Sequence, residues 1–206
     1  EKLIKLSFVA NNLRNIDDEN LRYDFSTINY VDIIRESLGL FREEAKKKGV
    51  TINEIEFKNI EKNKPCVIQA SESHLRQVIF NVVHNAVKYS FEGNQERERY
   101  ISVICKEYGY YICIEISNYG TGITEAELKD GMIYKMGYRG IMAGDRSRIG
   151  SGLGLWIAKR MIEDHHGKIV ITSTRVGEGE KVDPYLTTIK LYLPLTQNMP
   201  PLQGVP

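Results

Sequence analysis

Three polar side chains recur at helical spacing within the segment HLRQVIFNVVHNAVKYS (74–90). Asn81, Asn85 and Lys88 stand at i, i+4 and i+7, so they share one face of a helix. Two carboxamides one turn apart can supply oxygen ligands to a hard cation such as Mg²⁺, and an ammonium group a turn further along suits a phosphate. A solvated helix face is the alternative interpretation, because surface helices commonly carry polar stripes.

A first glycine-rich segment, ISNYGTGI (116–123), follows directly on an apolar run that is typical of a strand. Gly120 and Gly122 allow the backbone to turn sharply and to approach a flat ligand. Asn118 stands at the end of the strand, where its amide offers both a donor and an acceptor to the edge of a purine. The segment predicts a base-binding loop, with an ordinary β-turn as the alternative.

A second glycine-rich segment, GSGLGL (150–155), opens a helix that is predicted to run from about Gly152 to His166–Gly167. The backbone N–H groups of a first helical turn and the positive end of the helix dipole favour an anion such as a phosphate chain. The segment matches neither GxGxxG nor GxxxxGK[ST], and no apolar strand directly precedes it. A Rossmann domain and a P-loop are therefore disfavoured.

The stretch between the two loops, residues 120–154, is rich in glycine and lacks apolar periodicity. It is too long for an ordinary connection, which indicates a functional lid. A local excess of positive charge fits closure over phosphates, although a solvated basic loop is the alternative. The cations are Lys135, Arg139, Arg146 and Arg148, opposed only by Asp145 after Asp130.

The helix that carries the asparagines is predicted to begin at Ser71 or Ser73 and to run to about Tyr89. Its apolar residues repeat with the helical period, so this helix presents a core stripe as well as a polar one. The core stripe consists of Leu75, Val78, Ile79, Val82 and Ala86.

Two further helices are predicted before it. Residues 1–15 carry apolar residues alternately three and four apart, the seam of a helix that packs on another helix. The next helix is capped by Asn29 and stops at Gly49, after three lysines. The seam is Leu3, Leu6, Ala10 and Leu13, and the second helix buries Val31, Ile34, Leu38, Phe41 and Ala45. Strands are predicted near 23–28, 50–57, 65–70, 100–107, 110–117, 168–174 and 186–193.

Composition sets the class of protein. A chain of 206 residues with 42% hydrophobic and 27% charged residues fits one globular domain with a short appendage. Lys plus Arg (28) nearly balances Asp plus Glu (27), so no overall field recruits nucleic acid or an anionic membrane. We expect neither nucleic-acid binding nor membrane contact by this chain.

The cysteines and histidines indicate no metal site. Three cysteines without a CxxC pair are expected to be reduced, in a cytosolic setting. The four histidines have no metal-ligand spacing and are expected to be structural or exposed. No apolar run reaches the length of a membrane span, and the start at Glu1 suggests a fragment of a longer protein, whose membrane-spanning part could lie elsewhere.

Taken in order, four segments resemble the catalytic ATP-binding domain of bacterial sensor histidine kinases. These are HLRQVIFNVVHNAVKYS, SNYGTGI, YKMGYRG (134–140) and GSGLGLWIAKRMIEDHHGKI (150–169). The resemblance covers roughly residues 23–195 and implies an α+β fold, a two-layer α/β sandwich of the Bergerat type. In that fold a mixed sheet is backed by helices on one face, and ATP lies beneath a flexible lid. Residues 1–16 resemble the end of the family's second dimerisation helix.

The resemblance implies a role for individual residues and a division of the chain. Asn85 is the expected Mg²⁺ ligand, and Asn81, Lys88 and Arg139 are the expected catalytic residues. ATP is expected to contact Asn85, Tyr89, Asn118, Gly120, Gly122, Ile123, Gly150, Ser151, Gly152, Leu153 and Gly154. The expected division is 1–20 as the end of the dimerisation helix, 21–195 as the catalytic domain and 196–206 as a disordered tail.

Two departures from the family pattern stand out. The family usually has Asp where this chain has Asn118, and loss of the charge is expected to weaken ATP binding by about 1–2 kcal/mol. None of the four histidines is followed by the acidic residue and proline that accompany a phosphoacceptor. The acceptor is therefore expected upstream of Glu1, on a dimerisation domain, and the fragment is not expected to autophosphorylate alone.

The expected function is that of a two-component histidine kinase, homodimeric in the full-length protein and partnered by a response regulator. Gyrase-, Hsp90- and mismatch-repair-type ATPases resemble the same family but carry a glutamate four residues before the Mg²⁺ asparagine. Here that position is Asn81, which favours phosphoryl transfer over hydrolysis. A degenerate domain that binds nucleotide or a protein partner without catalysis is the second alternative, because Asn118 replaces the acid.

Overall fold

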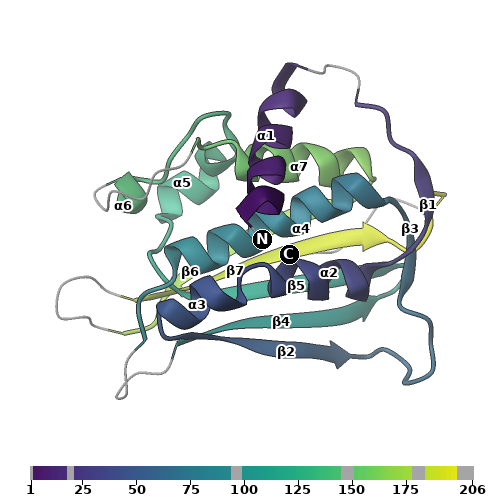
Figure 1. Ribbon diagram of the computed structural model, residues 1–206, viewed down its shortest axis with the longest axis horizontal. Coiled ribbons are helices and arrows are strands. Elements are labelled where there is room, and N and C mark those ends of the chain that lie inside the picture. The colour runs from purple at the N-terminus through teal and green to yellow at the C-terminus, as the bar shows by residue number, and fades with distance from the viewer. Residues whose placement is uncertain (1, 18–20, 94–98, 145–150, 178–183, 199–206) are drawn as a thin grey trace.

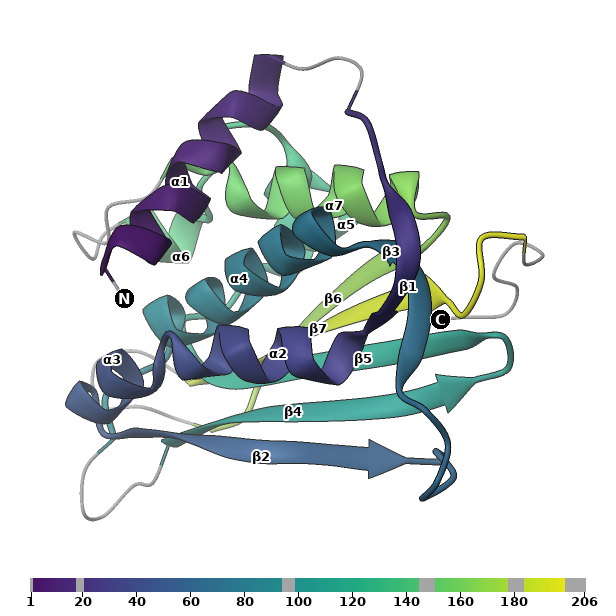
Figure 2. The same cartoon turned by 45° about the vertical axis from the view of Figure 1, so that its right-hand side comes forward.

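The computed structural model describes residues 2–17, 21–93, 99–144, 151–177 and 184–198. Helices lie over one face of a five-stranded sheet (Figure 1), and Figure 2 shows the same two layers from a second side. The helices are α1 (Lys2–Asp17), α2 (Tyr30–Gly39), α3 (Arg42–Lys47), α4 (Glu72–Tyr89), α5 (Glu125–Lys129), the 3₁₀ helix η1 (Met132–Tyr134), α6 (Ile141–Gly144) and α7 (Gly154–Asp164). The strands are β1 (Phe25–Asn29), β2 (Val50–Lys58), β3 (Val67–Ser71), β4 (Arg99–Tyr108), β5 (Tyr111–Gly120), β6 (Lys168–Arg175) and β7 (Tyr185–Pro194).

The sheet has the strand order β2-β4-β5-β7-β6. Strands β2 and β4 pair in parallel and the other neighbours pair antiparallel, while β1 and β3 form a separate two-stranded sheet. The predicted α+β fold, with a mixed sheet backed by helices on one face, is confirmed. The order also places Asn118 of β5 directly opposite Thr187 of β7.

The predicted helix from Asn29 to Gly49 is wrong in one respect, because the structure divides it into α2 and α3. The chain breaks at Leu40–Phe41, where the N–H groups of both residues still bond to preceding carbonyls. The Phe41 ring is fully buried beside the rings of Phe80 and His84. The five residues of the predicted apolar stripe are all buried, so the face was predicted correctly while the continuity was not.

Helix α4 forms the centre of the core and ends within a well-defined cap. All five residues of its predicted core stripe are buried. The Nζ of Lys48 donates to the carbonyl oxygens of Val87 (2.8 Å) and Lys88 (3.0 Å), so a cation satisfies the end of the helix that its dipole makes negative. Ser90 Oγ adds a hydrogen bond of 2.7 Å to the carbonyl of Ala86.

Backbone contacts join the end of α4 to the end of β5. The N–H of Thr121 donates to the carbonyl of Tyr89 (2.9 Å), and that of Phe91 to the carbonyl of Tyr119 (3.0 Å). Ser90 and Gly120 form a β-bridge between these two contacts. A Cβ on Gly120 would lie 1.9 Å from the Tyr89 carbonyl oxygen, so only glycine leaves room for this approach.

We predict that Gly120→Ala destabilises the fold by about 1–3 kcal/mol, the usual cost of forcing an extra methyl group into a packed interior. Gly39→Ala is the matched control, because nothing lies within 4 Å of a Cβ at that position in α2. Urea denaturation should show a lower midpoint for Gly120→Ala alone. Equal loss in both variants would contradict the steric account.

Helix α1 packs across the helix layer through a face that differs from the predicted one. Phe8 stacks on Phe80 at 4.3 Å between ring centroids, and Lys5 pairs with Glu44 at 3.0 Å. The predicted seam residues Leu3 and Leu6 are instead 81% and 63% exposed. These two leucines therefore do not pack on another described helix, because the aromatic and polar contacts orient α1 with both of them outward. The Leu13 side chain lies outside the described residues.

The stretch 120–154, predicted to be irregular, contains the short helices α5, η1 and α6 in its described part. Its flexibility remains a prediction, and Arg146, Arg148 and Gly150 lie outside the described residues. In the predicted tail, Gln197 bonds to Gln69, and residues 199–206 are likewise not described. Among the described helices, none combines the length and apolar character that crossing a membrane requires.

His165 is a structural residue at the end of α7. Its Nε2 accepts a hydrogen bond from the Ser71 N–H (3.0 Å), so the proton is on Nδ1, which lies 2.6 Å from the Met161 carbonyl oxygen. The rings of Tyr23 and Phe25 pack against it. Burial lowers the pKa of His165 below the ordinary value of 6.5.

We predict that the chain loses stability as the pH falls below about 6.5. The unfolded chain then takes up a proton at His165 that the folded chain does not, so the free energy of unfolding decreases. Urea denaturation at pH 7.5 and pH 5.5 measures the effect. His165→Gln, which keeps a neutral acceptor, should reduce the loss, whereas the exposed control His166→Asn should not. His74 and His84, whose pKa values burial also lowers, leave some dependence in every variant.

Candidate functional site

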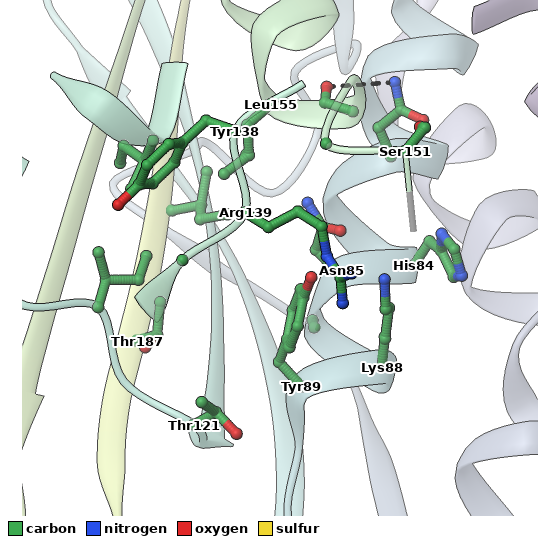
Figure 3. A pocket seen from close by; sticks show the side chains of 18 of the residues that line it. His84, Asn85, Lys88, Tyr89, Thr121, Tyr138, Arg139, Ser151, Leu155 and Thr187 are labelled. Atoms are coloured by element: carbon green, nitrogen blue, oxygen red, sulfur yellow. Dashed lines mark hydrogen bonds between the residues drawn. The ribbon is translucent and has the colours of Figure 1, made fainter. Parts of the chain in front are cut away.

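A cavity of about 350 Å³ lies between α1, α4, the end of β5, the first half of β7, the segment around Arg139 and the start of α7. Its size falls in the range of small-molecule sites. Figure 3 shows its side chains converging from these elements. None of the described residues that line it is acidic, whereas Lys88 and Arg139 are cationic. The cavity is therefore suited to an anionic ligand.

Asn85, Lys88 and Tyr89 line the cavity from the last turns of α4. No hydrogen bond joins the Asn85 side chain to another described residue, so its carboxamide oxygen is available to a ligand. Figure 3 shows Arg139 reaching across the cavity toward Asn85 and Tyr89. The helical spacing thus brings these residues together with the lid arginine, while their ligand roles remain predictions.

Asn81 lines the same cavity as the other residues of the predicted polar stripe, but it is only 3% exposed. Its amide exchanges two hydrogen bonds of 3.0 Å with Asn12 of α1. Gln77 Nε2 donates to the same Asn12 oxygen at 2.8 Å. Asn81 therefore joins α1 to α4 in this structure, and the catalytic role expected for it remains a prediction.

The inner end of the cavity is walled by buried apolar side chains and a few polar ones. Ile133 and Ile189 are 5% and 7% exposed, and Ile123 lies beside them. Asn118 is 6% exposed and its amide nitrogen has no hydrogen-bond partner among the described residues. The hydroxyl-bearing residues Thr121 and Thr187 complete this end, which suits a flat, partly polar ring.

The glycines of the two loops lie at close approaches of the backbone. Gly152 has a φ of +70°, and a Cβ there would lie 2.5 Å from the carbonyl carbon of Gly137, so the loop before α7 touches the lid segment. A Cβ on Gly122 would lie 2.3 Å from the Tyr185 ring. Gly154, by contrast, has room for a Cβ, at 3.7 Å from Asn81.

The other predicted ligands are distributed unevenly. Gly122, Ser151, Gly152 and Gly154 line the cavity. Gly120 does not line it and instead backs the end of α4, while Leu153 is buried in the core at 6% exposure. Gly150 lies outside the described residues.

Glu127 of α5 anchors the lid segment. Its carboxylate accepts hydrogen bonds from the N–H and hydroxyl of Thr124 (2.8 and 2.6 Å), the Tyr138 hydroxyl (3.0 Å) and the Ile141 N–H (2.8 Å). Burial alone would raise the pKa of Glu127, but these bonds outweigh it and hold the pKa below its ordinary value. Because Tyr138 lines the cavity, Glu127 positions one side of its wall.

We predict that Glu127→Gln loosens the lid segment. Each carboxylate oxygen of Glu127 accepts two of the four hydrogen bonds, and the glutamine amide nitrogen, in place of either oxygen, would face two donors and accept neither bond. The loss should be about 1–3 kcal/mol in stability, with faster hydrogen exchange at the Ile141 amide. Glu125→Gln is the matched control, since its side chain in the same helix is 80% exposed. Similar exchange rates at Ile141 in both variants would contradict this anchoring role.

A family model described as "Histidine kinase-, DNA gyrase B-, and HSP90-like ATPase" matches residues 70–197, more than half of the chain. The chain belongs to this family. The family resemblance of the four ordered segments is thereby confirmed. Within this ATPase family, the probable sensor kinase SilS of Salmonella typhimurium is 29% identical over 164 residues, which cover 80% of this chain and 30% of SilS. The chain thus spans about 30% of the length of that relative.

Solved histidine kinase structures share the fold of this ATPase family member. The solved catalytic domain of histidine kinase ThkA superposes with a TM-score of 0.64 at 23% identity, and the match covers 84% of this chain and 97% of that domain. The mycobacterial sensor histidine kinase MprB superposes with a TM-score of 0.64 at 23% identity, and the match covers 82% of this chain and 97% of the solved chain. Full-length ShkA in complex with AMPPNP superposes with a TM-score of 0.69 at 19% identity, and the match covers 98% of this chain and 37% of the solved chain.

Several residues at or beside the cavity were not predicted from the sequence. Thr124 and Glu127 form a capping box, a T-x-x-E signal that was readable in the sequence. Thr187 and Tyr138 had no local signal, because their positions depend on sheet order and on the path of the lid. Asn12 could not be found from its own helix, since its partner lies 69 residues away.

Proposed function

We propose that this chain is the ATP-binding catalytic domain of a two-component sensor histidine kinase, presenting Mg-ATP to a histidine on an upstream dimerisation domain. The observation that carries the proposal is one cavity with a cationic outer part and an apolar, amide-bearing inner end, in a member of this ATPase family. The triphosphate is assigned to the outer part and the adenine to the inner end.

The outer part of the cavity fits a magnesium-bound phosphate chain. Asn85 offers a carboxamide oxygen with no described protein partner, a ligand type suited to Mg²⁺, which in nucleotide sites takes few protein ligands and several phosphate and water oxygens. When bound, Mg²⁺ would neutralise part of the negative charge of the phosphates. Gly152 and the first turn of α7 offer backbone N–H groups, with Lys88 and Arg139 as the cations nearby.

The same cavity is poorly suited to hydrolysis. Activation of water requires a general base, and the described lining residues include no carboxylate. Asn81 occupies the position where related ATPases carry glutamate, and its amide is satisfied by Asn12. The γ-phosphate should therefore persist until a histidine is presented to it.

The partners are inferred from relatives. SilS is named as a probable sensor kinase, ShkA was solved with AMPPNP, and ThkA was solved in complex with the response regulator TrrA. We assign to this chain a phosphoacceptor domain from the longer protein, dimeric when complete, and a response regulator downstream. The sequence-based expectation of a cytosolic location is retained as part of this proposal.

We predict that the 206-residue chain binds Mg-ATP in calorimetry and that Asn85→Ala weakens this binding at least tenfold, because one carboxamide ligand is lost. Asn63→Ala, on an exposed turn, is the matched control. With labelled ATP, the isolated chain should remain unlabelled, while a dimerisation domain of a histidine kinase added in trans should acquire label. Steady ATP hydrolysis by the isolated chain, or label on it, would contradict the proposal.

A further inference from the structure

Asn118 is a buried polar residue of the cavity wall, and the described residues satisfy its side chain incompletely. It lines the inner end of the cavity at 6% exposure, and its amide nitrogen has no partner among the described residues. An unpaired amide buried in this way is unfavourable unless a ligand completes it. The side chain therefore points to a ligand that offers a polar edge at this position.

No hydrogen bond to a described residue fixes the orientation of the Asn118 amide. Asn81 shows the opposite case, because its oxygen and nitrogen are both engaged by Asn12, and Gln77 Nε2 donates to the oxygens of both amides, which fixes their orientation. A carboxamide without such bonds can rotate by half a turn and exchange its donor and acceptor. Asn118 can thus present either an oxygen or an N–H to the same ligand position.

This choice matters for purine recognition. Adenine presents an amino donor at position 6 and an acceptor at N1, whereas hypoxanthine and guanine present an oxygen acceptor at position 6 and a donor at N1. A carboxylate accepts only, so where it faces the group at position 6 it favours the adenine amino group and opposes a 6-oxo group. A carboxamide matches both patterns, one in each orientation.

The neighbours of Asn118 impose no contrary preference. Thr187 lies directly across the strand pair, and Thr121 follows at the end of β5. The Thr187 hydroxyl lies 2.9 Å from Ser173 Oγ, and a threonine hydroxyl is not restricted to accepting hydrogen bonds. The apolar walls formed by Ile123, Ile133 and Ile189 hold a flat ring without distinguishing its edge groups. No side chain at this end is restricted to accepting hydrogen bonds, within the part of the chain that the structure describes.

We infer that Asn118 relaxes base selection, so that the site takes 6-oxopurine nucleoside triphosphates as well as ATP. The inference rests on the proposed function, which places the purine at the inner end of the cavity. Asn118 acts as a specificity-determining residue through the orientation of its amide, and the phosphate-facing residues are common to both classes of nucleotide.

Binding of ATP and inosine triphosphate (ITP) in the presence of Mg²⁺ tests the inference. The two ligands share ribose and triphosphate, so the ratio of their Kd values isolates the base. For the 206-residue chain we expect a ratio within about fivefold, and for Asn118→Asp a preference for ATP that is larger by at least about tenfold, because a carboxylate bonds the amino group more strongly and opposes the 6-oxo group. Circular dichroism checks that each variant is folded.

Asn118→Ala provides a second variant if Asn118→Asp fails to fold, and it should weaken both nucleotides without restoring a preference for ATP. A strong preference for ATP in the unaltered chain, or an unchanged ratio in Asn118→Asp, would overturn the inference while leaving ATP binding intact. If neither nucleotide binds, the proposed function is overturned as well. Binding of both nucleotides without phosphoryl transfer would overturn the kinase assignment alone.

Discussion

The site depends on the backbone contact between Tyr89–Ser90 and Gly120–Thr121. Helix α4 carries Asn85 near its end, and strand β5 carries Asn118 near its end. The two elements are not consecutive in the sequence, because β4 lies between them. The hydrogen bond from Thr121 to Tyr89 and the bridge between Ser90 and Gly120 fix their separation. Because the approach leaves no space for a Cβ at Gly120, a single glycine determines how far the cationic part of the cavity lies from its inner end.

Asparagine serves three different purposes around this contact. Asn81 is fully bonded and joins α1 to α4, Asn85 has no described partner and faces the cavity, and Asn118 is buried with an unpaired nitrogen. All three are carboxamides rather than carboxylates, and the described part of the cavity lining contains no acidic side chain. The wall thereby attracts phosphate while its inner end stays neutral.

The sequence predicted those features that depend on local periodicity. The core and polar stripes of α4 and the buried stripe through Phe41 follow from helical spacing, and the mixed sheet follows from the family resemblance. The break at Leu40–Phe41 was not predictable in the same way, because Phe41 there packs against Phe80, a residue distant in the sequence. Thr187 reaches Asn118 only through the pairing of two strands that are distant in sequence.

The docking of α1 shows why long-range polar contacts escape pattern reading yet matter to the site. The apolar seam of α1 predicted that its leucines form the packing face. In the structure Leu3 and Leu6 face outward, and Phe8 and Asn12 make the contacts with α4. Asn12 makes the two shortest hydrogen bonds of the Asn81 amide, so a displacement of α1 leaves this buried amide with only the 3.4 Å contacts to Gln77 and the Gly154 carbonyl unless water or a ligand replaces Asn12. The position of α1 and the polarity of the cavity are therefore energetically linked through one pair of amides.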